Sequence, residues 1–590
     1  MSEMSVKILR GLFCIAIGTA LFSSMQSTAF GQQCPERLDG LWGAELSFGP
    51  EARGPLTITR RGSSWFASII GIEVPIERKE GQLNFRLPAE RGEFRGRLVQ
   101  KGTRIRGHWI QPMTSHVWGS VYATPVELRL TGRGKWSGQV LPLDDSEGIF
   151  LFIARDPAGN LNAFVRNPER NLGRYLGAMQ VDCHGNQVRF IRNEGAQTVS
   201  GNYNKDEDVL SIYLPTESAT FDLTRRKRDN ASGFYARISP TYTYHRPDVR
   251  NDGWETATLT GVGIDPKPLL ALVHRIIETP ISDVAAPYPQ ALLVARHGKL
   301  VFEEYFFGFH ADRVHDVRSA GKTLTTTLIG IAMQRGSQLM LKTPVVSLFP
   351  HYAELKNDTS SKRAITIQHL LTMTSGLDAD DDNNASPGTE DRLVNQKDRY
   401  RFTLDLPMAH APGEKAVYSA AGINLLGGIV QQATGTWLPE FMHSHFARPL
   451  DIQHYHVPLS PTGDAYMAGG ILMRPRDFMK LGQLFLSRGR WHGRQVVDKD
   501  WAIDSTRAHS SIYAAGDYGY GWWIREVTVD GRRYRTFRAA GNGGQLVIVV
   551  PDLDLVVLFM GGNYNQGPVW YPWNDEFIPK VIIPAVNQPK

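Results

Sequence analysis

With 590 residues, 42% of them hydrophobic and 21% charged, the chain has the composition of an ordinary globular protein and is long enough for several domains. Its net charge of +6 at pH 7 is a mild excess over this length. Because the lysines and arginines form no stripe interleaved with aromatic residues, the composition argues against nucleic acid as a partner.

The first 31 residues have the pattern of a secretory signal peptide. Lys7 and Arg10 precede an apolar stretch from residue 11 to 22, and Ala29-Phe30-Gly31 fits a small-x-small cleavage site. The apolar stretch is short for a membrane span, and an uncleaved anchor is the alternative. We therefore expect a periplasmic or secreted protein with no membrane span after cleavage.

Cysteine usage leaves one candidate disulfide. Cys14 falls in the signal segment, so Cys34 and Cys183 remain in an oxidising compartment. A bond between them would close a loop of about 150 residues and stabilise the fold by about 4–5 kcal/mol at most in the chain-entropy model. Two free, buried thiols are the alternative, and only geometry decides between them.

Residues 35–230 are predicted to be antiparallel and all-β, because short alternating strands and frequent glycines fill them. Glycine-aromatic strand starts recur with an offset of 94 residues: Gly40-Leu41-Trp42 matches Gly134-Lys135-Trp136, and Gly54 matches Gly148. We predict a tandem repeat with units at 35–133 and 134–230. One irregular β domain is the alternative.

The β region carries no evident catalytic cluster and is interpreted as a scaffold or a ligand-binding accessory. Several tryptophans could line a ligand cavity, although aromatic residues at strand starts usually belong to the core. These residues are Trp42, Trp65, Trp109, Trp118 and Trp136.

The second half of the chain has a different pattern. Residues 231–262 are polar and turn-rich, which indicates a linker. From residue 263 to 590 we expect an opening helix at 268–277 and a hairpin with strands at 291–296 and 300–306. Helical segments then fill roughly 320–500, and strands return at 521–524, 546–550 and 555–559. A sheet built from both ends of a segment, with helices inserted between them, predicts an α/β sandwich.

A Ser-x-x-Lys tetrad, Ser319 to Lys322, opens an apolar run that extends to Gln334. A serine at such a position lies near a helix N-terminus, where free N–H groups favour negative charge, and a lysine three residues later shares its helical face. A hydroxyl, an amine and an anion-favouring helix end are parts of an acyl-transfer site. A capped amphipathic helix with an exposed lysine is the alternative for the tetrad alone.

Further motifs follow the tetrad in a fixed order. They are the segment Ile365–Leu377, Ala411-Pro412-Gly413-Glu414, Tyr418-Ser419-Ala420, Asn424-Leu425-Leu426-Gly427, Arg448-Pro449-Leu450, Ala468-Gly469-Gly470, Arg474-Pro475-Arg476-Asp477, Tyr518-Gly519-Tyr520-Gly521-Trp522 and Gly541-Asn542-Gly543-Gly544-Gln545. With the tetrad, this set resembles the class C β-lactamase-like serine hydrolases, which include β-lactamases, D,D-peptidases and esterases. The resemblance covers about residues 262–575 and implies the serine β-lactamase/transpeptidase type of α/β sandwich.

The resemblance implies roles for individual residues. Ser319 would be the nucleophile, Lys322 its proton acceptor or electrostatic activator, and Tyr418 a second base. Asn542, Gly543 and Gly544 would border the substrate. The backbone N–H groups of Ser319 and Gln545 would receive the oxyanion. No metal or organic cofactor is implied.

Two departures from the family pattern weaken a β-lactamase interpretation. Ala420 replaces the asparagine of a Tyr-x-Asn element, and Asn542 replaces a cationic or titratable residue. A neutral amide at 542 cannot help to hold Tyr418 ionised by charge. Because β-lactam antibiotics and peptidoglycan stems carry a carboxylate that favours a cation there, an esterase is weakened less.

Metal sites are not expected. The acidic segment 378–384 starts like a calcium loop but lacks its glycine and its last glutamate, so we interpret it as a solvated loop that could rim the cleft. His443 and His445 lack a third nearby zinc ligand.

Two functions remain open at this point. The first is an extracytoplasmic serine hydrolase that forms an acyl-enzyme at Ser319 and acts on a small ester, amide or D-aminoacyl substrate. The alternative is a non-catalytic binding protein, in which the β domains hold a ligand and the weakened hydrolase fold recognises without turnover. Retention of Ser319, Lys322 and Tyr418 together argues against the alternative.

Overall fold

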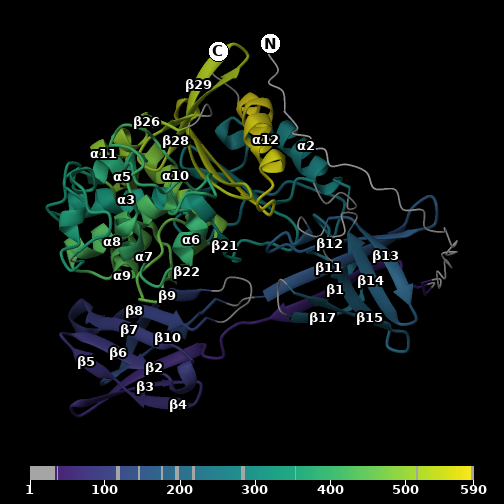
Figure 1. Ribbon diagram of the computed structural model, residues 1–590, viewed down its shortest axis with the longest axis horizontal. Coiled ribbons are helices and arrows are strands. Elements are labelled where there is room, and N and C mark those ends of the chain that lie inside the picture. Colours follow the sequence, from purple (N-terminus) through teal and green to yellow (C-terminus); the bar gives the residue numbers. More distant parts are fainter. Residues whose placement is uncertain are drawn as a thin grey trace, which may run out of the picture.

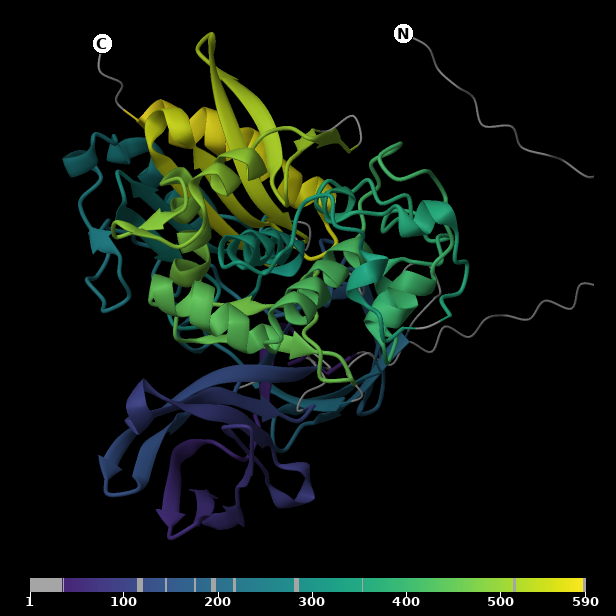
Figure 2. The same cartoon turned by 90° about the vertical axis from the view of Figure 1, so that its left-hand side faces the viewer.

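The computed structural model describes residues 34–35, 37–113, 120–143, 146–173, 177–192, 198–215, 219–280, 286–352, 354–512 and 516–586. The expected signal peptide and Trp118 lie outside these ranges. Two β-rich bodies, coloured purple to blue, lie beside an α/β body, coloured teal to yellow (Figures 1 and 2). Within the described residues, no helix combines the length and apolarity needed to cross a membrane.

The first β body is a strongly curved antiparallel sheet in the order β4-β3-β2-β10-β9-β8-β7-β6-β5. Its core holds the predicted tryptophans Trp65 and Trp136, whose rings stack with centroids 5.0 Å apart, together with the buried Trp109. The strands are β2 (Gly54–Arg61), β3 (Ser64–Ile69), β4 (Ile72–Pro75), β5 (Glu77–Lys79), β6 (Gln82–Arg86), β7 (Glu93–Val99), β8 (Arg104–Gln111), β9 (Val121–Gly132) and β10 (Lys135–Val140).

The second β body is a closed antiparallel barrel in the order β1-β11-β12-β13-β14-β15-β16-β17. Trp42, Phe190 and Phe221 fill its interior and are almost fully buried. The strands are β1 (Gly40–Ser47), β11 (Ser146–Arg155), β12 (Leu161–Arg166), β13 (Met179–His184), β14 (Gln187–Arg192), β15 (Thr198–Asn204), β16 (Val209–Leu214) and β17 (Ala219–Arg225). Cys34 and Cys183 are joined by a disulfide bond, so the alternative of two free thiols does not apply.

The two bodies do not divide at the expected boundary between residues 133 and 134. β10 forms a hairpin with β9 and also pairs with β2, so it completes the first body. β1 leaves the first unit and closes the second barrel between β11 and β17. In Figure 1 the purple β1 accordingly lies beside β11 and β17, away from β2. Gly40 and Gly134, the matched glycines, therefore stand at the start of β1 and directly before β10. β1 completes the second body and β10 completes the first.

The expected linker at 231–262 is a packed strap. Trp254 is 3% exposed, and its indole N–H donates to the Arg476 carbonyl. Within the strap, β18 (Glu255–Thr256) pairs in parallel with β20 (Lys299–Tyr305), the second strand of the hairpin in the α/β body. The Arg476 guanidinium binds both oxygens of Glu303 at 2.8 and 2.6 Å and Asp252 at 2.9 Å. The strap is thus held by buried ion pairs as well as by apolar contacts.

The third body is an α/β sandwich, as predicted. Its sheet has the order β18-β20-β19-β31-β30-β29-β28-β27-β26, so strands from both ends of the segment meet in its centre. Alternate residues of β19 face opposite cores, with Leu293 on one side and Leu292 on the other. The strands are β19 (Pro289–Arg296), β20 (Lys299–Tyr305), β26 (Ser510–Ser511), β27 (Asp517–Tyr518), β28 (Trp523–Val529), β29 (Arg532–Gly541), β30 (Gln545–Val550) and β31 (Leu555–Gly561).

Helices cover both faces of this sheet. α2 and α12 pack on one face, while α3, α8 and α10 belong to the core of the other face. The helices are α2 (Pro266–Ile277), α3 (Gly321–Gln334), α4 (Ser360–Arg363), α5 (Ile367–Leu371), α6 (Glu390–Val394), α7 (Arg399–Asp405), α8 (Ala420–Thr434), α9 (Leu438–Met442), α10 (Pro475–Leu486), α11 (Lys499–Ser505), α12 (Gly567–Phe577) and α13 (Ile583–Ala585).

One ladder joins the first β body to the α/β body. β22 (Tyr455–Leu459) pairs with the start of β9, with Val457 opposite Ala123. β22 also pairs with β23 (Leu472–Met473), which pairs with β21 (His315–Asp316), three residues before Ser319. Figure 1 shows β9 and β22 at this junction. The accessory sheet is therefore continuous with the segment that leads into the Ser-x-x-Lys tetrad.

Candidate active site

Ser319 lies in a single 3-10 turn, residues 318–320, directly before α3. The turn is entered through Arg318, whose φ of 49° is in the left-handed region that costs roughly 1–3 kcal/mol for a residue other than glycine. The buried Asp316 carboxylate compensates by accepting from the Arg318 backbone N–H at 2.7 Å and by pairing with its guanidinium at 3.1 Å. Ser319 itself is neither buried nor fully exposed, so it is open to a substrate.

Lys322 approaches Ser319 as the tetrad spacing predicts. Its side chain is 1% exposed, and its ammonium group donates to Ser319 Oγ at 2.9 Å and to the Ala468 carbonyl at 2.9 Å. The alternative of an exposed lysine on an amphipathic helix therefore does not apply. α3 is buried on nearly all sides, and its threonine hydroxyls donate to neighbouring carbonyls, for example Thr326 to Tyr520 at 2.9 Å. These bonds fix the helix that carries Ser319 and Lys322.

Tyr418 completes the cluster from the loop before α8. Its ring centroid is 5.0 Å from the Lys322 ammonium and 5.7 Å from the ring of Trp523. Burial raises the pKa of the Tyr418 phenol well above its usual value, and a hydrogen bond with Ser319 opposes this only in part. The carboxylates of Asp381 and Glu390 raise the same pKa further. The site therefore holds Tyr418 as a neutral phenol.

The Asn542-Gly543-Gly544 segment is a tight turn that connects β29 to β30. Gly543 and Gly544 have φ values of 91° and 96°, which favour glycine. A methyl group added at Gly541 would lie 2.6 Å from the Val317 carbonyl oxygen, so glycine is needed for the strand to approach the tetrad. The Asn542 side chain is bonded to Asn565.

Gln545 is the first residue of β30, and its side chain points away from the cleft. It is fully buried, and its amide donates to the Gly561 carbonyl at 2.6 Å. Only its backbone N–H is thus available for the role implied by the resemblance. The structure brings Ser319, Lys322 and Tyr418 together and places the turn 542–544 at the end of β29.

Asp381 is the site residue that sequence reasoning missed. Asp382, Asn383 and Asn384 are exposed, as expected for a solvated loop, but Asp381 turns inward and is partly buried. Its carboxylate accepts from the backbone N–H groups of Ala420 at 2.7 Å and Glu390 at 2.8 Å. Burial raises the pKa of Asp381 to about 7, while the nearby Lys322 cation opposes the rise.

Asp381 lies next to the position where the family asparagine is absent. Ala420 offers no side-chain amide, and its backbone N–H is bonded to the Asp381 carboxylate. The Asp381 carboxylate therefore lies near Lys322 and Tyr418, where the family pattern would place the side-chain amide of an asparagine at position 420. Nothing in the sequence spacing of these residues could have indicated the contact, because 39 residues separate Asp381 from Ala420.

The accessory barrel reaches the rim of this site. Asn171, in the loop after β12, donates to the Gln566 side chain at 2.8 Å. Gln566 also accepts from Asn563, and the neighbouring Asn565 donates its backbone N–H to Asn542 at 2.6 Å. The barrel thus supports the segment that holds the substrate-side turn.

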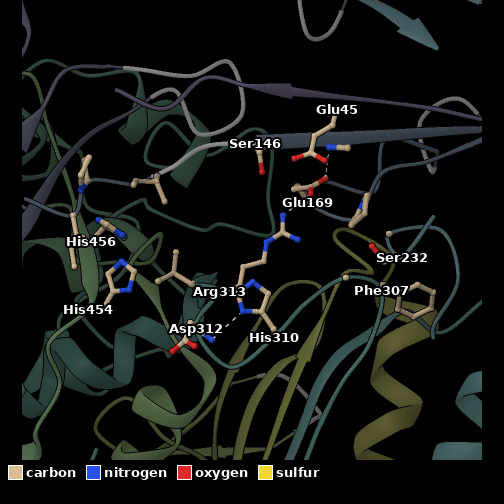
Figure 3. Close-up of a pocket in the computed structure, with 18 of the residues that line it drawn as sticks. Glu45, Ser146, Glu169, Ser232, Phe307, His310, Asp312, Arg313, His454 and His456 are labelled. Carbon is tan, nitrogen blue, oxygen red and sulfur yellow. Dashed lines mark hydrogen bonds and ion pairs between the residues drawn. The ribbon is translucent and has the colours of Figure 1, made fainter. Parts of the chain in front are cut away.

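A cavity lies at the junction of the three bodies, apart from Ser319, Lys322 and Tyr418. It has a volume of about 860 Å³, and Ser319, Lys322 and Tyr418 are not among its lining residues. Figure 3 shows Arg313 extending across it toward Glu169, with which it forms an ion pair at 2.6 Å. This cavity therefore does not include the candidate catalytic residues.

Neither of the histidines considered for zinc belongs to a metal-binding group. His443 is bonded to the Tyr455 hydroxyl at 3.1 Å and faces the ring of His108. In the part of the chain that the structure describes, no group of three or more histidine, cysteine, aspartate or glutamate residues is arranged to hold a metal ion.

Ser319 is half-buried and contacts the buried Lys322 at the start of a central helix in an α/β sandwich. This arrangement defines the chain as a serine hydrolase of the Ser-x-x-Lys type. Residues 282–562 match the Beta-lactamase family model. This part of the chain is a domain of the beta-lactamase family.

Three curated relatives are similar to parts of this chain. The 6-aminohexanoate-dimer hydrolase of Paenarthrobacter ureafaciens is 26% identical over 45% of this chain and 71% of its own length. Esterase EstB of Burkholderia gladioli is 28% identical over 27% of this chain and 45% of its own length. The D-alanyl-D-alanine-carboxypeptidase/endopeptidase AmpH of Escherichia coli is 22% identical over 40% of this chain and 66% of its own length.

One solved structure resembles about half of the chain. EstCE1, a hydrolase with promiscuous acyltransferase activity, superposes with a TM-score of 0.40 at 18% identity, covering 48% of this chain and 92% of that protein.

Proposed function

We propose that the protein hydrolyses small esters or amides through an acyl-enzyme at Ser319. The observation that carries this proposal is the contact of Lys322 Nζ with Ser319 Oγ at 2.9 Å, inside a wall that leaves the serine open to solvent. A serine hydroxyl becomes an effective nucleophile only when its proton has an acceptor within hydrogen-bond reach.

In the first step, Ser319 Oγ attacks the substrate carbonyl and its proton passes to the Lys322–Tyr418 pair. The bond from the carbonyl carbon to the leaving group then breaks, and that proton goes to the leaving oxygen or nitrogen. Because burial, together with the nearby carboxylates, holds Tyr418 neutral, its hydroxyl is suited to relay the proton, and the Lys322 side chain accepts it as the uncharged amine. Water then cleaves the acyl-serine by the reverse sequence of proton transfers.

The charges around the cleft favour a substrate with a cationic amine on its acyl side, such as a D-aminoacyl or aminoalkanoyl compound. Asp381, Glu390 and Asp382 all act on the Tyr418 phenol, so the wall around this residue is acidic. The opposite turn carries the neutral Asn542 where a carboxylate-bearing antibiotic would favour a cation. We therefore rank aminoacyl esters and amides above β-lactams.

We also propose that the protein acts outside the cytoplasm, in the periplasm or after secretion. The disulfide between Cys34 and Cys183 supports this location, because such bonds persist mainly in oxidising compartments. The support is independent of the signal-like pattern at the N-terminus.

A fluorophosphonate probe followed by intact-mass analysis tests the role of Ser319. Wild type and Ser360→Ala, which alters an exposed serine, are expected to gain one adduct, whereas Ser319→Ala gains none. Hydrolysis of p-nitrophenyl butyrate should fall by roughly 10⁴-fold or more in Ser319→Ala. Absence of labelling in every variant would favour the non-catalytic binding protein.

A substrate comparison tests the aminoacyl preference. D-alanyl p-nitroanilide, p-nitrophenyl butyrate and nitrocefin would be compared by kcat/KM on wild type, with Tyr418→Phe as the variant that keeps the ring. Tyr418→Phe is expected to lose about 10²–10⁴-fold in kcat, the usual contribution of one proton-transfer group. Nitrocefin as the best substrate would contradict the proposed preference.

A further inference from the structure

A second cavity lies in the hydrolase body, between the end of α10, α11 and strands β28 and β29. Its volume is about 620 Å³, within the range of roughly 300–1,000 Å³ that is typical of small-molecule sites. Its floor is apolar. The floor residues are Phe485, Leu486, Ala502, Ile503, Ile524 and Phe537. Ser319, Lys322 and Tyr418 do not line it.

The rim of this cavity carries charge of a single sign. Arg488, Lys499, Arg507 and Arg535 are all exposed there, and the lining includes no acidic residue. Arg535 donates to the Thr506 carbonyl, and Arg507 is 3.9 Å from the Asp504 carboxylate, a long contact in an exposed pair.

Two of these cations have unused hydrogen-bonding capacity. Among the described residues, the side chains of Arg488 and Lys499 make no hydrogen bond or ion pair with the protein. Arg488 follows the C-cap of α10, Lys499 is the first residue of α11, and both line the same cavity. A carboxylate placed between them would receive charge-assisted hydrogen bonds, which are about twice as strong as neutral ones.

We propose that this cavity binds a fatty carboxylate, with the acyl chain on the apolar floor and the carboxylate held by the basic rim. The apolar floor excludes a purely polar anion as the best ligand, because such an anion would leave the floor exposed to water. The basic rim, with no acidic residue in the lining, disfavours a neutral alkyl chain as the best ligand. A single chain with one anionic head satisfies both parts of the lining.

Equilibrium binding of monomeric sodium dodecanoate to the full chain tests the proposal. All variants are made in the Ser319→Ala background. Dodecanoate could also bind beside Ser319 as the product of an ester, and a difference in binding between wild type and this background would reveal it. The test variant is Arg488→Glu/Lys499→Glu, and the matched control is Arg532→Glu/Arg533→Glu, which reverses two exposed charges on β29 outside the cavity. Circular dichroism confirms that each variant is folded.

We expect one equivalent of dodecanoate to bind the background and the control with equal affinity, and the test variant to bind at least tenfold more weakly. Dodecanol should bind at least tenfold more weakly than dodecanoate to the background. Any of four results would overturn the proposal. The test variant could bind dodecanoate as tightly as the background does, or the background could bind dodecanol as tightly as dodecanoate. The background could also bind no dodecanoate at all, or bind phosphatidylglycerol vesicles but not monomeric dodecanoate. A loss of activity with binding intact concerns the proposed function alone.

Discussion

At the scale of single residues, the charge state of Asp381 affects the electrostatic environment of Lys322 and Tyr418. Its carboxyl has a pKa of about 7 in the folded chain, above its ordinary value of 3.8, because burial disfavours the ionised form. The folded state therefore holds this proton more tightly than the unfolded state does. The resulting stability is complete below about pH 4 and is lost as the pH rises through about 7.

We expect Asp381→Asn to gain thermal stability relative to wild type as the pH rises from 4 to 7, with the gain constant above pH 7. Wild-type kcat/KM for an aminoacyl substrate is expected to show an inflection near pH 7, where Asp381 ionises, and Asp381→Asn should lack this inflection. Asp530→Asn, which changes an exposed aspartate in the turn between β28 and β29, should keep both behaviours of wild type. Thermal melts and rate profiles from pH 4 to 9 check this; identical profiles for Asp381→Asn and wild type would contradict it.

At the scale of elements, the position of β1 in the second barrel depends on a disulfide bond. The segment leading into β1 is bonded through Cys34 to Cys183 on β13, so the disulfide fixes the segment that closes the second barrel. Its loop spans 149 residues, and such a closure removes conformational entropy mainly from the unfolded chain.

We therefore expect Cys34→Ser/Cys183→Ser to lose about 2–5 kcal/mol in the free energy of unfolding of the second barrel. Tryptophan fluorescence of the chemically denatured protein measures the loss, since Trp42 lies in this barrel core. A reducing agent applied to wild type should reproduce the shift. Should neither treatment change the transition, β1 must be held by its ladders alone.

The strap at residues 231–262 depends on the buried Arg476. Arg476→Met would leave Glu303 and Asp252 buried without their cation, and removal of one partner of a buried pair typically costs about 3–5 kcal/mol. Thermal unfolding is expected to show this as a clear fall in Tm. The matched control Arg61→Met, in an exposed pair with Glu73, should leave Tm unchanged; equal effects of the two variants would argue against a buried network.

At the scale of the whole molecule, the three bodies form one continuous structure. β22 pairs with β9, Thr124 bonds His456 at 2.7 Å, and Arg313 pairs with Glu169 at 2.6 Å. These contacts come from both accessory bodies and surround the strands that lead to Ser319. Without them the hydrolase body would expose a strand edge and several buried polar groups.

Accordingly, a fragment of residues 263–590 is expected to aggregate or to melt at a lower temperature than the full chain. Light scattering after size-exclusion chromatography and thermal melts would measure this. The full chain with Asn171→Ala serves as the local comparison, because it removes only one contact at the rim. A monomeric fragment with the full chain's Tm and activity would show that the accessory bodies are dispensable.

Much of the hydrolase body follows from local sequence. The helix expected at 268–277 is α2 at Pro266–Ile277, and the strands expected at 546–550 and 555–559 are β30 and β31. The Ser319–Lys322 contact is a property of three-residue spacing on one helical turn, so it too is local. Apolar periodicity and glycine positions determine such features without reference to distant parts of the chain.

The sequence by itself determined the order of the elements, the tetrad and the family resemblance. Only the tertiary structure decided that β1 and β10 complete different β bodies and that Asp381 lies beside Lys322. The physical reason is that strand partners and charge contacts depend on which distant segments meet. That choice is set by the packing of the whole chain, because backbone pairing is available to any strand and local periodicity does not distinguish between partners.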